Sequence, residues 1–505
     1  MAEIELKLEL PARSHGAFRR LPELGGSAGL TRRLHALYFD TPDFELRRRE
    51  MALRLRRSGR RWTQTLKAGR SGAAGLHARE EWEFERPRAT LDLNLFDETP
   101  LAAEPELAQR LGEIFQVDVR RTTWQVEVSP GNRVEVALDR GEVRHGDRAE
   151  AISEVEIESV SGDPLAVFDL AERFLGPTAS VEGVSGTLRP SPVTKAQRGY
   201  RLARNETQAP VKARAAELDA AMAPAEAARV IARAAIDQLQ ANEPGVIARG
   251  DPEFLHQYRV ALRRLRSALG VFRAATGPEA AGLRDELRWI AALTGPARDW
   301  DVFATTTLPA LLQAHDDTRV GRTVRARARG RADDAHAQLR AALESPRYAL
   351  LMLALARWLA QPPALTGQPA EPLAAFAARA VAKRHKRLLA DTRRLSALTP
   401  AERHALRLDA KRLRYALEGF ASLFRRRRVG AHLEALSEIQ DDLGRANDAA
   451  VAARLLQELS PATSLAQFAR GWFAAEARAS AAGLERHAQR LEDVPGLKLR
   501  NRPQA

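Results

Sequence analysis

Four charged residues near the start of the chain, Glu3, Glu5, Lys7 and Glu9, alternate with four aliphatic ones. This period of two is typical of a β-strand, so the charged side chains share one face and the aliphatic side chains the other. Carboxylates in a row with one ammonium group could bind a divalent metal ion and phosphate together. The same alternation is also typical of a solvated edge strand whose charges discourage pairing. Alternation alone favours this second interpretation.

Later segments repeat the arrangement, with charges of one sign on one face of each expected strand. These same-face sets are Arg54 and Arg56; Glu81, Glu83 and Glu85; and Glu154, Glu156 and Glu158. Several strands of this kind could line one charged interior if the sheet closes, so we expect a barrel of about eight strands. A sheet whose outer face is rich in charge is the alternative.

A different pattern occurs in the back half, where a histidine is followed by cations at positions +3, +7 and +10. The two copies, 148 residues apart, are His256, Arg259, Arg263 and Arg266, and His404, Arg407, Lys411 and Arg414. Because a helix turns by 100° per residue, these positions span about 80° and form one stripe on each helix. Acidic i, i+4 partners are mostly missing, which favours an anion-binding groove over a solvated face.

These residues must be positioned by two kinds of structure. Residues 1–204 have alternating runs separated by turn residues, which predicts an antiparallel sheet with a few helices. Residues 205–217 are predicted to be a linker, and residues 218–500 have helical spacing throughout. A repeat near 150 residues indicates two similar helical bundles, related by a pseudo-two-fold, rather than a solenoid. The predicted class is therefore an α+β multidomain protein.

Charge and composition narrow the classes of partner. Basic and acidic residues balance through Arg204, at 32 each, so the whole net charge of +14 belongs to the residues that follow. That excess predicts a polyanionic partner for the back half. The chain has no cysteine, which excludes disulfides and thiolate metal sites and fits a cytoplasmic protein. No segment approaches the roughly 20 apolar residues that a membrane helix needs.

The motifs together resemble two known families. Glu3-x-Glu5-x-Lys7 resembles the signature of CYTH domains, which are triphosphate tunnel metalloenzymes. Further segments similar to that family, in its usual order, are 38–43, 52–56, 64–67, 138–142, 153–158 and 195–200. The back half resembles a CHAD domain in the segment that starts at His256 and in residues 295–301.

The CYTH resemblance implies an eight-stranded antiparallel barrel that uses Mg²⁺ or Mn²⁺ to hydrolyse inorganic tripolyphosphate to pyrophosphate and phosphate. The implied catalytic residues are Glu3, Glu5 and Lys7, and the implied metal ligands are Glu3, Glu5, Glu154 and Glu156. The implied phosphate-binding residues are Lys7, Arg54, Arg56, Lys67, Arg121 and Lys195. Strand register leaves open whether Arg120 or Arg121 points inward, and which of Glu81, Glu83, Glu154, Glu156 and Glu158 orient metal or water.

The CHAD resemblance implies that the two histidine-bearing stripes bind inorganic polyphosphate, with association with polyphosphate granules as one location. Two other functions stay open: the same barrel acting on an organic triphosphate, including adenylate cyclase chemistry, and a non-catalytic polyphosphate-binding protein. Nucleic-acid binding by the helical half is disfavoured because aromatic residues for base stacking are sparse on the basic helices. No membrane partner is expected.

Overall fold

The computed structural model describes residues 4–69, 74–77, 80–102, 104–176, 188–315, 318–361, 371–459 and 464–500. The chain divides into two compact units. The first comprises Met1–Ala209 together with Leu343–Gln361, and the second comprises Pro210–Ala342 together with Pro362–Ala505. The first unit therefore includes a segment from within the range 218–500. The predicted limits of the linker, 205–217, stay a prediction.

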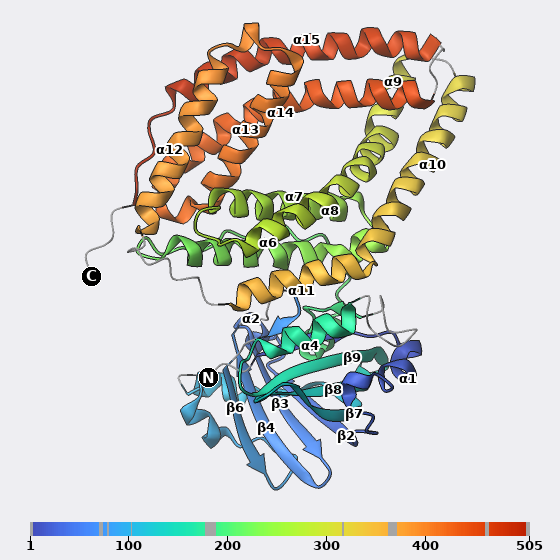
Figure 1. Cartoon of the computed structure of the whole chain (residues 1–505), viewed down its shortest axis with the longest axis vertical. Helices are drawn as coiled ribbons and strands as arrows, with labels where there is room; N and C mark the ends of the chain where they lie inside the picture. The colour runs from blue at the N-terminus through green and yellow to red at the C-terminus, as the bar shows by residue number, and fades with distance from the viewer. Residues whose placement is uncertain are drawn as a thin grey trace. The chain divides into compact units, whose positions relative to one another are not determined.

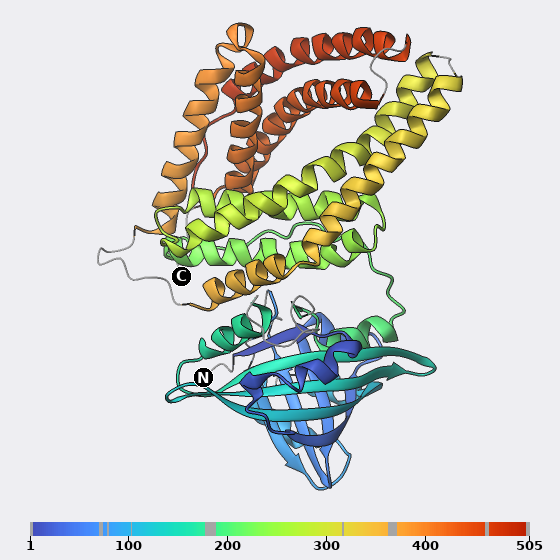
Figure 2. The same cartoon turned by 45° about the vertical axis from the view of Figure 1, so that its right-hand side comes forward.

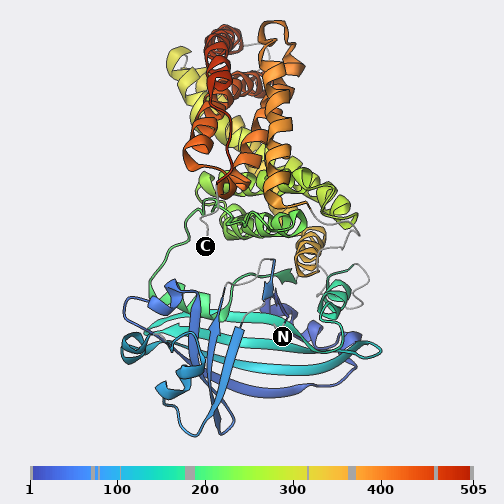
Figure 3. The same ribbon diagram turned by 90° about the vertical axis from the view of Figure 1, so that its left-hand side faces the viewer.

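Ten strands among the described residues of the first unit pair antiparallel into one sheet, in the order β10-β1-β9-β8-β7-β2-β3-β4-β6, with β5 also paired to β1 (Figure 1). Their bounds are β1 Glu5–Glu9, β2 Leu30–Asp40, β3 Met51–Ser58, β4 Arg61–Ala68, β5 Leu76–His77, β6 Glu80–Arg86, β7 Gly112–Ser129, β8 Asn132–His145, β9 Arg148–Ser161 and β10 Arg189–Pro190. Figure 3 shows that β3 and β4 run steeply across the long strands β7 to β9, so the sheet is strongly curved.

The predicted number of eight strands is corrected to ten. Two of them, β5 and β10, are only two residues long and pair with β1, and alternation over two residues leaves no signal in a sequence. The mixed α+β class and the antiparallel pairing are confirmed. Among the described residues no ladder joins β6 to the other end of the sheet, so closure into a barrel stays a prediction.

Six α-helices also lie in the part of the first unit that the structure describes. They are α1 His15–Phe18, α2 Glu45–Arg48, α3 Pro105–Gln109, α4 Ala166–Leu175, α5 Lys195–Ala203 and α11 Pro346–Ala360. Helix α4 packs on β7, β8 and β9, and α11 packs in turn on α4. Arg357 of α11 donates to Asp169 of α4 at 2.7 Å. A helix encoded far along the chain therefore belongs to the sheet unit.

Helix α5 lies on the other face of the sheet from α4 and begins at a well-defined residue. Thr194 and Gln197 form a capping box, which satisfies the backbone N–H groups at the helix start. Gly199 allows a close approach, because a Cβ there would lie 2.1 Å from the Phe115 ring of β7. Tyr200 then packs edge-on against the same ring. The capping box and these contacts fix Lys195, the first residue of α5.

The described residues of the second unit form helices joined by loops, with one isolated antiparallel bridge between Phe424 and Leu499. Its helices are α6 Pro224–Ile247, α7 Pro252–Val271, α8 Glu279–Val302, α9 Leu308–His315, α10 Thr318–Leu343 (whose last residue belongs to the first unit), α12 Leu373–Thr392, α13 Pro400–Gly419, α14 Arg426–Leu459 and α15 Ser464–Asp493. Figure 2 shows α14 and α15 as a long pair. None of the described helices is long and apolar enough to cross a bilayer.

The two copies of the predicted repeat fall in α7 and α13, which pack against each other. Phe272 and Phe420, which occupy equivalent places after the two stripes, contact each other edge-on at 5.4 Å between ring centroids. Phe376 of α12 stacks on Phe272. The repeat copies are therefore joined through equivalent residues of one core.

Candidate functional site

Three carboxylates gather on one face of β8 and β9. Asp139, Glu154 and Glu156 each offer an oxygen, and these oxygens all lie within 4.8 Å of one another. Asp139 and Glu154 are directly opposite in the β8–β9 ladder, and both are fully buried. Because like charges this close repel one another, the arrangement requires cations among them.

Two cations reach these carboxylates from α5 and β7. The Lys195 ammonium lies 2.6 Å from Asp139 and 2.8 Å from Glu156. Arg121 donates two parallel hydrogen bonds to Asp139, at 2.8 and 2.7 Å, and a third to Glu156. The paired bonds are the fork geometry that suits a carboxylate or a phosphate.

The third cation, Lys7, comes from β1, the strand with alternating charged and aliphatic residues. In the β1–β9 ladder Lys7 lies directly opposite Glu156, and its ammonium contacts that carboxylate. It also lies 3.2 Å from both Glu5 and Glu154. Lys7 is buried, so the charged face of β1 points into the protein and the edge-strand interpretation is wrong for this residue.

The pKa values of these groups follow from their mutual attraction. Burial alone lowers the pKa of Lys7, but Glu154, Glu156 and Glu5 raise it well above its ordinary value. Burial likewise raises the pKa of Glu156, yet Lys195, Lys7 and Arg121 hold it well below the ordinary value. Both groups are therefore charged at neutral pH.

One buried oxygen in this group has no partner. Glu154 Oε1 contacts Lys7 and Lys195, whereas no described residue donates a hydrogen bond to Glu154 Oε2. A buried carboxylate oxygen without a donor is costly, and a metal ion would satisfy it. Oxygen ligands from carboxylates are those that Mg²⁺ and Mn²⁺ prefer. The residues present therefore fit a divalent metal ion.

A second charged group lies on β3, β4 and β6. The Lys67 ammonium pairs with Glu81 at 2.7 Å. Arg54 lies 3.5 Å from Glu81, and Arg56 lies 3.5 Å from Glu83, which is longer than a good hydrogen bond. No described residue accepts a hydrogen bond from the buried Arg54 Nε. The two guanidinium groups are therefore only loosely held.

The two groups face one interior. Arg54 lowers the pKa of Arg56 to about 10, helped by burial and by Arg121 of the first group. Because these three arginines repel one another, a multivalent anion bound among them would be stabilised. The predicted phosphate-binding residues Lys7, Arg54, Arg56, Lys67, Arg121 and Lys195 all lie in these two groups.

The structure decides between the two neighbouring arginines of β7. Arg121 points inward to Asp139, whereas Arg120 is exposed on the opposite face. Asp139 was not predicted as a site residue. Its signal was present, because it stands between the buried residue Leu138 and the exposed Arg140 in an alternating strand. Glu3 lies outside the described residues.

The remaining glutamates of the expected strands are also placed. Glu81 and Glu83 belong to the second group, as described above. Glu158 lies opposite Glu5 in the β1–β9 ladder. Glu9 lies opposite Glu154 in the same ladder, and its carboxylate pairs with Arg198 of α5 at 2.7 Å.

In the helical unit, the basic stripes of α7 and α13 converge. Arg259 and Arg263 of α7 lie near Arg407 and Lys411 of α13. Burial lowers the pKa of Lys411, and the positive charges of Arg407 and Arg263 lower it further, to about 7. Burial and Arg263 lower the pKa of Arg259 to about 10. We call these four residues the groove cations.

The acceptors near the groove cations come from α8 and α14. Arg259 donates to Thr294 at 3.0 Å, and Arg407 lies 4.0 Å from Asp448. No described residue accepts a hydrogen bond from the buried Nε of Arg259 or of Arg407. The groove cations are thus short of acceptors.

The other predicted stripe residues lie less centrally. His256 is close enough to Arg259 and Arg263 for their charges to lower its pKa, although burial is the main cause. Arg266 is exposed. Burial of part of the side chain lowers its pKa, and the charges of Arg288 and Arg412 lower it further. Arg414 pairs with Glu418 at 2.8 Å. His404 is exposed. The structure therefore brings together four cations and one histidine from the eight predicted residues.

Comparisons with known proteins agree with this division. The family model described as CYTH domain matches residues 1–200, and that described as CHAD domain matches residues 230–457. A protein of Haemophilus influenzae named inorganic triphosphatase is 34% identical over 170 residues, which is 33% of this chain, and the match spans 44% of that relative's length.

Among solved structures, the CHAD domain from the plant Ricinus communis is 37% identical, with a TM-score of 0.52. The match covers 58% of this chain and 100% of that one. The resemblance that the motifs indicated is therefore confirmed. The chain belongs to the CYTH and CHAD families, with a CYTH domain in its N-terminal part and a CHAD domain in its C-terminal part.

Proposed function

We propose that the sheet unit hydrolyses inorganic tripolyphosphate to pyrophosphate and phosphate in a closed tunnel, with Mg²⁺ or Mn²⁺. The observation that carries the proposal is the charged interior, where buried and half-buried cations from five elements lie among carboxylates. The name of the Haemophilus influenzae relative supports a triphosphate as the substrate.

The residues of the interior divide the work. Tripolyphosphate carries about four to five negative charges, and Arg forks with Lys point charges are the groups that bind such an anion. Arg54, Arg56 and Lys67 hold one part of the chain of phosphates, while Lys7, Arg121 and Lys195 hold the other. A carboxylate of the cluster orients the attacking water and accepts its proton.

The metal ion would be held by Asp139, Glu154 and Glu156, with Glu5 and Glu3 adding carboxylates from β1 and the residues before it. Bound there, it would offset negative charge on the transferred and leaving phosphate oxygens. Asp139 is an addition to the ligands that the resemblance implies.

Replacing Glu5 by Gln is expected to abolish metal-dependent phosphate release from tripolyphosphate without unfolding the sheet. The side chain is partly exposed and its closest described partner is Lys7, so its loss leaves the apolar core intact. Release of phosphate and thermal unfolding are measured together. The matched control is Glu9→Gln on the same strand, and equal activity of both variants would contradict the role of Glu5.

Substrate choice is tested by comparing tripolyphosphate, ATP and thiamine triphosphate in one phosphate-release assay. We expect tripolyphosphate to be hydrolysed with the highest kcat/KM. Higher kcat/KM for ATP or thiamine triphosphate would assign an organic triphosphate, and binding without turnover would assign a non-catalytic role.

We further propose that the groove cations bind inorganic polyphosphate, and that the protein acts in the cytoplasm, including at polyphosphate granules. The support is the convergence of positive charge from two repeat copies onto a place with few acceptors. We include His256 in this polyphosphate-binding surface and place Arg266, His404 and Arg414 at its margins.

Affinity for polyphosphate is expected to fall as pH rises from 7 to 8.5. The pKa of Lys411 is lowered to about 7 in the free protein, so above this pH the amine must regain its proton before it can pair with phosphate. The limit for one proton is tenfold per pH unit. Binding is measured at constant ionic strength for the wild type and for Lys411→Arg, which stays charged. Parallel pH profiles for the two proteins would refute the assignment to Lys411.

A further inference from the structure

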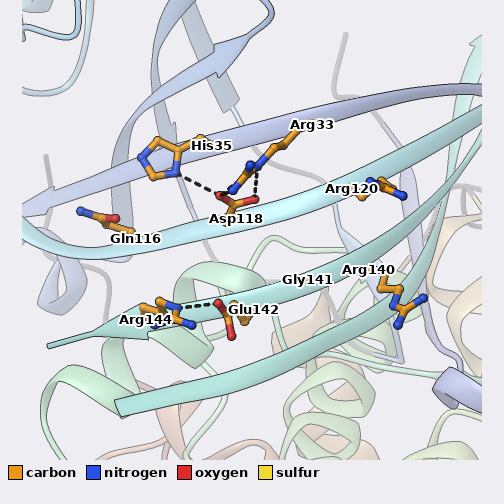
Figure 4. Close-up of a pocket in the computed structure, with 9 residues that line it drawn as sticks. All are labelled: Arg33, His35, Gln116, Asp118, Arg120, Arg140, Gly141, Glu142 and Arg144. Carbon is orange, nitrogen blue, oxygen red and sulfur yellow. Dashed lines mark hydrogen bonds and ion pairs between the residues drawn. The ribbon is translucent and has the colours of Figure 1, made fainter. Parts of the chain in front are cut away.

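The outer face of the sheet is covered by helices over only part of its area. Near α1 and α4 it is apolar, where Phe18 packs edge-on against Trp124 and Phe174. Away from these helices it is hollowed and polar, with a cavity of about 590 Å³ (Figure 4). This cavity is lined by Arg33, His35, Gln116, Asp118, Arg120, Arg140, Gly141, Glu142 and Arg144.

Three arginines form a row across this face. Arg33 of β2 lies directly opposite Arg120 of β7, which lies directly opposite Arg140 of β8. Like charges directly opposite in an antiparallel pair destabilise a sheet unless an anion lies between them. With strands about 4.8 Å apart, the row extends over about 10 Å. We call these three residues the outer arginine row.

Only one end of the outer arginine row is neutralised. Arg33 donates to both oxygens of Asp118, at 2.9 and 2.7 Å, and Arg144 pairs with Glu142 (Figure 4). Both acidic residues among those lining the cavity are thereby engaged. Within the described part of the chain, Arg120 and Arg140 form no ion pair, and both are exposed.

Positive charge continues beyond the row on both sides. On the α1 side, burial lowers the pKa of His15, and the positive charges of Arg140 and Arg19 lower it further. On the β3 side, a second hollow of about 420 Å³ adjoins the first. It is lined by Arg32, Arg33, His35, Arg57, Ser58 and Gly59. The basic surface therefore crosses several strands and is longer than a single phosphate.

We propose that the outer arginine row binds inorganic polyphosphate at a site separate from the interior. Arg120 and Arg121 are neighbours in β7, so their side chains point to opposite faces of the sheet and no single phosphate group can bind at both sites. Guanidinium forks match phosphate oxygens. None of the residues lining either hollow is a Phe, Tyr or Trp that could stack on a base, which favours a polymer of phosphates over a nucleic acid.

This inference rests on the proposed function for the identity of the polymer. Tripolyphosphate enters the interior alone, whereas a long chain engages the outer arginine row as well. Loss of the row is therefore expected to weaken the binding of long polyphosphate and to leave hydrolysis of tripolyphosphate unchanged.

The test uses the full chain with Arg120→Gln and Arg140→Gln combined. To remove the contribution of the helical unit, the pair is also made in an Arg263→Gln, Lys411→Gln background. In that background we expect about tenfold weaker binding of polyphosphate of roughly 100 phosphates. We also expect the slope of log K against log salt concentration to fall by about 0.7 for each phosphate that no longer pairs with an arginine.

The matched control removes the same charge elsewhere on the sheet unit, through Arg88→Gln and Arg133→Gln, and is expected to change the affinity less than twofold. Lysine at both row positions is expected to restore most of the binding, which separates charge from folding. Equal effects of the row pair and the control pair would overturn the proposal. So would an effect on duplex DNA without one on polyphosphate.

The same experiment distinguishes this proposal from the proposed function. If Arg263→Gln and Lys411→Gln leave the affinity unchanged, the role of the groove cations is wrong. The difference between the row pair and the control pair still decides whether the outer face binds polyphosphate.

Discussion

Replacing Glu154 by Gln is expected to lower kcat/KM for tripolyphosphate roughly a thousandfold. The amide keeps the shape and the Oε1 acceptor but cannot neutralise Lys7 and Lys195, both of which contact that oxygen. It also replaces the unpartnered Oε2 with an NH₂ group, which cannot bind a metal ion. Phosphate release at saturating Mg²⁺ or Mn²⁺ measures the loss.

A second readout separates metal binding from phosphate binding in this variant. Because one negative charge leaves the interior, tripolyphosphate without metal is expected to bind at least as tightly as to the wild type. The free energy of unfolding is expected to fall by about 3 kcal/mol, since a buried ion-pair network loses one partner. The control is Glu85→Gln on β6, whose side chain is 81% exposed. Retention of more than a tenth of the wild-type activity would be incompatible with the assignment of Glu154.

Arg263→Gln combined with Lys411→Gln is expected to weaken polyphosphate binding by about a hundredfold or more. Each substitution removes a charge-assisted hydrogen bond worth roughly 1.5–3 kcal/mol, and about 1.4 kcal/mol is a factor of ten. The two residues come from different repeat copies, so each helix loses one of its two groove cations. Equilibrium binding at two salt concentrations measures both the affinity and the number of phosphates that the protein neutralises.

The control for the groove cations is a double variant with the same net charge as Arg263→Gln combined with Lys411→Gln. Arg325→Gln with Arg329→Gln removes two exposed cations from α10 of the same unit and is expected to change the affinity less than threefold. Similar losses in the two double variants would show that total charge, and not the convergence of α7 and α13, determines binding. Hydrolysis of tripolyphosphate is expected to be unaffected in both.

The sequence predicts the charged strands well because the charged residues of each strand gather on one face. Glu5, Lys7, Arg54 and Glu156 are examples, and the structure places all of them in one interior. Asp139 was not found in this way, since Ala137 and Gly141, its nearest neighbours on the same face of β8, carry no charge that marks the face. Arg120 and Arg121 could not be separated either, because a shift of one residue in register exchanges their faces.

In the helical half, too, the sequence predicts local patterns but not the contacts between distant residues. The spacing of the stripes identified the helices and their basic faces, but not which stripe residues meet. Arg259 and Lys411 meet because α7 packs on α13, a contact between residues far apart in the sequence. Arg414 shares the stripe but is neutralised by Glu418, an i, i+4 pair that the pattern itself contained.

Helix α11 has a consequence for how such a protein can be divided or recombined. A gene fragment that ends at Ala209 encodes all the strands but omits the helix that covers α4. The sheet unit is thus discontinuous in the gene, and its missing piece is embedded in the coding region of its neighbour. A C-terminal cassette moved to another protein would carry with it a helix that belongs to the unit left behind and whose apolar residues, including Tyr348 and Trp358, are buried in the full chain.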